Sequence, residues 1–178
     1  MAHPEAAHAI NALEAARAGF FHPLTGLDHL LVMVAVGLWA VRLGGRALWM
    51  LPCAFVLPMI LGGVAGMGST SQPLIEHGIT ASLLLLGAAL GMAWKPSLPV
   101  ALGMVALGGV CHGFAHGSEM PAGSMPLLFL ASMTVATSLL HAGGVAAGLS
   151  CEGRRLEPAL RIAGLVLIIF SVITVVAG

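Results

Sequence analysis

The sequence predicts an all-α, polytopic membrane protein: a bundle of six transmembrane helices with both termini on the outer side. Two observations predict this class. Of the 178 residues, 58% are hydrophobic and only 8% are charged, whereas about a quarter of the residues of a soluble domain are charged. The apolar residues also occur in long runs, and the mean hydropathy is +1.01. Because so few polar side chains cannot cover a water-facing surface, we expect a lipid bilayer around the chain.

Six stretches reach the length of about 20 mostly apolar residues that a transmembrane helix needs. We expect helices at residues 26–43, 47–68, 74–94, 97–117, 126–149 and 160–177. The connections between them are short, and no linker divides them, so they form one expected transmembrane domain at 26–178. Residues 1–25 are expected to form a short amphipathic arm. This arm lacks the basic start and apolar core of a signal peptide, and it resembles the end left after a signal has been removed.

Basic residues predict the orientation of the bundle. They lie in the first, third and fifth connections, as Arg42 and Arg46, Lys95, and Arg154, Arg155 and Arg161. These connections share one end of an up-and-down bundle, and an excess of Lys and Arg marks the cytoplasmic end. Both termini are then expected to face the periplasm.

The other polar residues gather at the opposite, outer level. They are His22, Asp28, His29, Glu76, His77, His112, His116 and Glu119, whereas His141 is expected deeper, toward the cytoplasm. Such an acidic, imidazole-rich mouth would concentrate cations. The net charge of zero gives no indication of a nucleic-acid partner.

The segment HPLTGLDH places two imidazoles and a carboxylate before the first apolar run. Because Pro23 and Gly26 interrupt regular structure, we expect His22 on a turn that folds back over Asp28 and His29. These groups suit nickel, cobalt, zinc or copper better than magnesium or calcium. The alternative is that Asp28 only caps its helix and complements the helix dipole.

The segment CHGFAHGSE is a second metal-binding pattern. His112 and His116 are four residues apart and share a helix face, which Glu119 extends. Intramembrane ionisable residues are functional by default, although a lone histidine can also be a hydrogen-bonded packing residue. Three glycines repeat at the same spacing on the neighbouring face, where another helix can approach closely: Gly109, Gly113 and Gly117.

Three further positions have two interpretations each. Glu76 and His77 either join the outer site or are a helix-start carboxylate and a surface histidine. His141 is either a core histidine bonded to Thr137 or an inner ligand on a metal path. His3, close to the N-terminal amine, could serve as a first capture site for nickel or copper.

Three segments together resemble the signatures of the HupE/UreJ family of bacterial nickel and cobalt transport proteins: HPLTGLDHLLVMVAVGLWA, CHGFAHGSE and SLLHAGGVAAG. The resemblance covers nearly the whole chain after the arm. It implies an inner-membrane permease that supplies metal for hydrogenase or urease maturation, with the metal as substrate and no prosthetic group. By motif, His22, Asp28 and His29 match the first block, His112, His116 and Glu119 the second, and His141 the histidine usual in the fifth helix.

We therefore predict a permease that moves Ni²⁺ or Co²⁺ from periplasm to cytoplasm and is not an enzyme. The sequence contains no G-x-x-x-x-G-K-[ST] loop, so the chain is not expected to hydrolyse ATP. An intramembrane zinc hydrolase is the rival interpretation, although H-E-x-x-H is missing from the sequence. A bis-histidine haem protein is a further alternative. The sequence leaves open the choice between nickel and cobalt and whether the chain forms a homo-oligomer.

Overall fold

The computed structural model describes residues 11–70, 72–151 and 155–177, and every regular element within them is a helix. The helices are α1 (Ala12–Thr25), α2 (Leu27–Leu43), α3 (Ala47–Gly66), α4 (Pro73–Gly91), α5 (Leu98–Ser118), α6 (Pro126–Ser150) and α7 (Leu156–Ala177). Helices α3 to α7 are five candidate membrane spans, and the bent pair α1–α2 makes a sixth if it is counted as one span. The predicted all-α membrane bundle is confirmed.

The arm before the first span contains the helix α1. The Asn11 side chain accepts a hydrogen bond from the Glu14 N–H, and the Glu14 carboxylate accepts one from the Asn11 N–H. This capping box satisfies N–H groups that the first helical turn leaves free. Farther along, α1 packs against α6 at Gly19, where a Cβ would lie 2.1 Å from the Phe129 carbonyl oxygen. The helix is therefore fixed at both its start and its middle.

The expectation that His22 lies on a turn is wrong. Helix α1 continues through His22 and Pro23 to Thr25, and the chain bends by 78° between α1 and α2. Proline lacks a backbone N–H, so the ladder of α1 loses one hydrogen bond at Pro23, yet the helix continues for two more residues. The break comes instead at Gly26, whose backbone is extended.

Glycines bring the helices that carry the polar residues into backbone contact. A Cβ at Gly37 of α2 would lie 2.3 Å from the His141 carbonyl oxygen of α6, and one at Gly144 would lie 2.2 Å from the Val34 carbonyl oxygen. The predicted glycine face of α5 contacts α3 in the same way. There, a Cβ would lie 2.0 to 2.3 Å from a carbonyl oxygen of α3 at Gly109, Gly113 and Gly117. Small residues thus set the separation of α2 from α6 and of α3 from α5.

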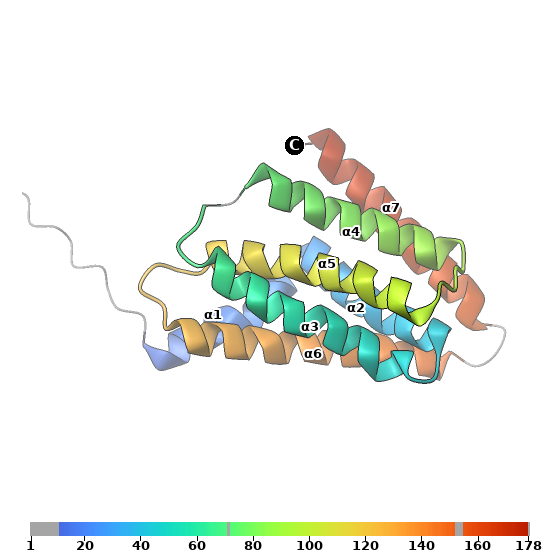
Figure 1. Cartoon of the computed structure of the whole chain (residues 1–178), viewed down its shortest axis with the longest axis horizontal. Helices are drawn as coiled ribbons and strands as arrows, with labels where there is room; N and C mark the ends of the chain where they lie inside the picture. The colour runs from blue at the N-terminus through green and yellow to red at the C-terminus, as the bar shows by residue number, and fades with distance from the viewer. Residues whose placement is uncertain (1–10, 71, 152–154, 178) are drawn as a thin grey trace, which may run out of the picture.

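The connections sort to the two ends of the bundle. Figure 1 shows the last residues of α2, α4 and α6 at one end of the bundle and the last residues of α3 and α5 at the other. The basic connections therefore share one end. At this end, Arg42 Nη2 lies 2.8 Å from Glu157 Oε1 and donates to the Ala93 carbonyl at 3.1 Å. Arg42 thus joins α2 to α7 and to the α4–α5 connection.

Candidate metal site

Four imidazoles from three helices meet at the end of the bundle opposite the basic connections. The ring centroids of His29 and His116 are 4.3 Å apart, those of His22 and His116 4.8 Å, and those of His29 and His112 5.1 Å. The bend at Gly26 explains this, because it turns α1 so that His22 approaches α5 beside His29. We call this set the outer cluster: His22, His29, His112 and His116, with the carboxylates of Asp28 and Glu119.

His22, His116 and Glu119 form one part of the outer cluster, in which Glu119 is exposed, His22 is half-buried and His116 is buried. One nitrogen or oxygen of each lies within 4.8 Å of the others. His22 Nε2 donates a hydrogen bond to Glu119 Oε2 at 3.1 Å, and this bond lowers the pKa of the Glu119 carboxyl group below its ordinary value. Glu119 is therefore a carboxylate at neutral pH. Metal–nitrogen and metal–oxygen bonds of about 2.0–2.2 Å require only a small contraction of this group.

The deeper part of the outer cluster is buried. His29 is 7% exposed, and its Nδ1 lies 2.8 Å from Asp28 Oδ1. The fully buried His112 places Nδ1 at 2.8 Å from the Gly108 carbonyl oxygen. Because a carbonyl oxygen only accepts, this nitrogen carries the hydrogen, and Nε2 keeps its lone pair. Metal-binding histidines are commonly oriented by such a bond.

Several imidazole nitrogens of the outer cluster have no hydrogen-bond partner in the described part of the chain. They are both ring nitrogens of His116 and Nε2 of His29 and of His112. Buried polar atoms are almost always hydrogen-bonded, so each exception needs an explanation. Unpartnered imidazole nitrogens beside two carboxylates make the outer cluster a candidate metal site, because these groups suit late first-row divalent metals.

His141 forms a separate, deeper position in α6. It is 1% exposed, and its Nδ1 donates to the Met33 carbonyl oxygen of α2 at 2.7 Å, while Nε2 has no partner among the described residues. The alternative of a bond to Thr137 is wrong, because the close approach of α2 offers a backbone carbonyl instead. In His141, as in His112, Nδ1 donates to a backbone carbonyl and Nε2 keeps its lone pair.

The chain matches the model of the family described as HupE / UreJ protein over residues 1–174. It is also 39% identical over 166 residues to Protein HupE from Rhizobium leguminosarum bv. viciae, which covers 92% of this chain and 87% of that protein. The chain belongs to the HupE/UreJ family. Membership associates it with transport of nickel and cobalt, and its apolar helices fit a multi-pass membrane protein of a permease family. No solved structure matches the chain.

Two of the predicted site residues of this HupE/UreJ chain, Glu76 and His77, lie on α4 and not on the helices that carry the outer cluster. His77 is exposed at the start of α4, and its Nδ1 donates to the Pro73 carbonyl of its own helix. The three groups that lie close enough together to hold a metal ion, those of His22, His116 and Glu119, include neither His77 nor the exposed Glu76. His3 lies outside the described residues.

Asp28 does not cap α2 through its side chain. The N-cap is Gly26, and it makes no side-chain capping bond. Asp28 lies in the first turn, where its charge still complements the helix dipole. Its carboxylate contacts His29 instead, which places negative charge beside the buried imidazoles.

Two groups at the site had no signal in the sequence. One is the backbone carbonyl of Met33, which accepts the hydrogen bond that orients His141. Every residue has such a carbonyl, so the residue type at position 33 does not indicate this role. The other is Phe55 of α3, whose ring contacts the rings of both His112 and His141. Only its position between Pro52 and Pro58 distinguishes Phe55 in the sequence, and this pattern does not indicate a site.

Proposed function

We propose that the chain is a permease that moves Ni²⁺, or Co²⁺, from the periplasm across a bacterial inner membrane into the cytoplasm, where it supplies hydrogenase or urease maturation. The convergence of the four histidines and two carboxylates of the outer cluster, with unpartnered buried nitrogens, carries the proposal. Family membership supports it. Imidazole and carboxylate ligands together suit late first-row divalent metals.

The outer cluster offers ligands in a graded order. Glu119 and His22 are reachable from outside and would bind the hydrated ion first. The imidazole would then carry its hydrogen on Nδ1, so that Nε2 offers a lone pair to the metal. His116 contacts both His22 and His29, so it passes the ion to the deeper ligands as water is removed. Asp28 supplies negative charge at that step. A permease must bind its ion well enough to remove water and weakly enough to release it, and a series of ligands satisfies both needs.

The membrane potential is a sufficient driving force for this transport. A charge that moves into a negative cytoplasm gains about 2.3 kcal/mol per 100 mV, and a divalent ion gains twice that. The direction rests on the positive-inside rule, which assigns the end with Arg42, Arg46 and Lys95 to the cytoplasm. The outer cluster then faces the periplasm, as the proposed direction requires.

Uptake of radioactive nickel into proteoliposomes tests the proposal, with cobalt, zinc and magnesium as competitors. Cobalt should compete strongly and magnesium weakly, because magnesium prefers oxygen ligands. His112→Ala should reduce uptake at least about tenfold, since it removes a buried ligand. His77→Ala is the matched control and should change uptake by less than about twofold. Equal losses in both variants, or no uptake by the wild type, would contradict the proposal.

A further inference from the structure

Phe55 contacts both the outer cluster and His141. Its ring centroid lies 5.4 Å from that of His112 and 5.1 Å from that of His141, and the residue is 1% exposed. The rings of His112 and His141 are therefore close to each other, and both contact the apolar ring of Phe55. Each of them has a buried Nε2 without a hydrogen-bond partner among the described residues.

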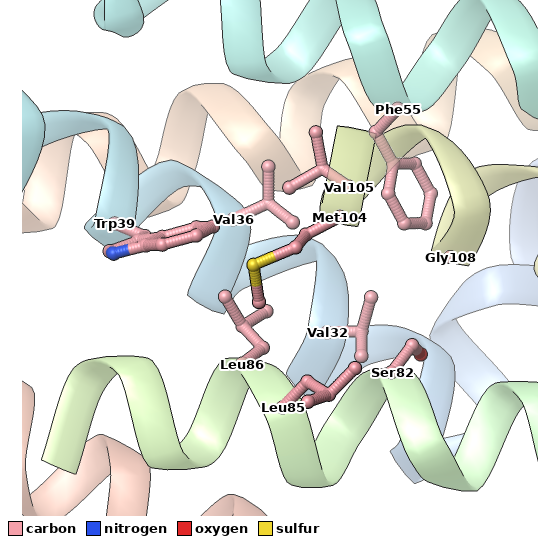
Figure 2. A pocket seen from close by; sticks show the side chains of 10 residues that line it. All are labelled: Val32, Val36, Trp39, Phe55, Ser82, Leu85, Leu86, Met104, Val105 and Gly108. Atoms are coloured by element: carbon pink, nitrogen blue, oxygen red, sulfur yellow. The ribbon is translucent and has the colours of Figure 1, made fainter. Parts of the chain in front are cut away.

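The backbone of Phe55 is fixed, whereas its ring adjoins free space. A Cβ at Gly109 would lie 2.3 Å from the Phe55 carbonyl oxygen, so α5 holds this part of α3 tightly. A cavity of about 20 Å³ lies between α2, α4 and α5, and Phe55 lines it together with Val105 and Gly108. Figure 2 shows the Phe55 ring at one end of this cavity, next to Gly108, with Trp39 at the other end.

Gly108 leaves the side of the ring open. A Cβ built at Gly108 would lie 3.7 Å from Phe55 Cε2 and 3.2 Å from the Ser82 Cβ. A methyl group there would occupy the space into which the ring could tilt. The cavity has about the volume that one water molecule needs, but most of the residues that line it are apolar, so it is better suited to a moving side chain than to water.

We propose that Phe55 is the gate residue between two metal-binding positions, the outer cluster and His141, and that it opens by tilting its ring toward this cavity. The inference rests on the proposed metal transport. Apolar constrictions block ions and water in channels because a hydrated ion cannot pass them. With the ring in place, an ion at His112 cannot reach His141. With the ring tilted, the ion exchanges one imidazole nitrogen for another.

The gate has a second consequence, for selectivity. An ion crosses the apolar step only if an imidazole receives it on the far side, and His141 Nε2 is oriented to do so. Magnesium, which binds imidazole poorly and loses water reluctantly, is held back. Phe55 is thus expected to keep magnesium out as well as to control the rate for nickel.

Phe55→Ala, Phe55→Leu and Gly108→Ala test the gate in proteoliposomes, with Phe129→Ala as the matched control. Phe129 is another fully buried phenylalanine; it contacts His22 and has no ring contact with His141 in the described part of the chain. Three quantities are measured: nickel uptake, magnesium entry detected by an internal dye, and nickel affinity by calorimetry. Elution volume and melting temperature in detergent identify the variants that fold.

Phe55→Ala should raise magnesium entry at least about fivefold, and nickel affinity should change by less than about threefold. Phe55→Leu, which retains much of the apolar bulk, should give an intermediate rise and tests the gate if the alanine variant does not fold. Gly108→Ala should slow nickel uptake severalfold without magnesium entry, because it restricts the ring. Phe129→Ala should leave magnesium entry at the wild-type level.

The gate is overturned if folded Phe55→Ala or Phe55→Leu excludes magnesium as well as the wild type does, or if Phe129→Ala admits as much as Phe55→Ala. Failure of the proposed function looks different, because wild-type liposomes would then take up no nickel. The magnesium comparison between the two phenylalanine variants remains decisive in that case, since it measures the barrier without nickel.

Discussion

The outer cluster and His141 use the same ligand chemistry in different surroundings. In the outer cluster, imidazoles contact one another and two carboxylates, and the outermost groups are exposed. His141 is a single imidazole held by a backbone carbonyl and covered by Phe55. Several converging ligands bind a metal tightly, whereas one ligand binds it weakly. From the proposed function we therefore expect the outer cluster to determine metal affinity and His141 to determine the rate of inward passage.

The largest effect on binding is expected from His116→Ala. His116 contacts both His22 and His29 and has two unpartnered nitrogens among the described residues, so its loss divides the outer cluster. Nickel affinity measured by calorimetry should fall at least about a hundredfold. Removing a residue that only hydrogen-bonds to a metal ligand lowers metal affinity about 10- to 100-fold, and removing a ligand itself should cost at least as much. Unchanged affinity in a folded variant would mean that the outer cluster is not the binding site.

His141→Asn should separate passage from binding. The asparagine amide can still donate to the Met33 carbonyl, but the ligand nitrogen is lost. Nickel uptake should fall at least about fivefold while calorimetric affinity changes by less than about twofold. If affinity falls with uptake, His141 shares a site with the outer cluster and the comparison fails. If neither changes, His141 serves only in packing.

Asp28→Asn should have a smaller effect, confined to the outer cluster. It removes negative charge beside His29 at the step where a dication loses water, and uptake should fall about fourfold, the equivalent of roughly 0.8 kcal/mol. Glu14→Gln is the matched control. Glu14 is exposed, and such charges are screened within about 8 Å at physiological salt, so uptake should change by less than about twofold. Equal losses would mean that Asp28 acts only through the general field of the outer surface.

The sequence predicted the helices and most of the outer cluster because their signals are local. Apolar runs locate the spans, and the four-residue spacing of His112 and His116 places them on one face of α5. The glycine face of α5 was predicted for the same reason. The amphipathic arm was predicted, but His22 was expected on a turn, whereas α1 continues through Pro23 and ends three residues after that histidine, at Thr25.

The order of the helices around the bundle could not be predicted from the sequence. The positions of Glu76 and His77 and the role of Phe55 depend on this order. Hydropathy assigns Glu76 and His77 to the same membrane level as the outer cluster but does not indicate which helices are neighbours. In the structure, α4 packs chiefly against α7, whereas α1, α2 and α5 carry the outer cluster (Figure 1). The role of Phe55 is also tertiary, since a phenylalanine in an apolar helix has no distinguishing pattern.

The smallest effect is expected from Asn11→Ala, and it tests whether the two positions are independent. Losing a capping side chain costs a helix about 1 kcal/mol, so the first turn of α1 should open more often. Contact with α6 at Gly19 holds the rest of the helix, and His22 lies beyond that contact, so nickel affinity should fall by less than about threefold. Amide hydrogen exchange should rise in the first turn of α1 and stay unchanged in α6 around His141, because the bond to Met33 does not involve α1. Faster exchange around His141 would show that α1 supports the whole path, and the division between a binding cluster and a separate passage residue would then have to be given up.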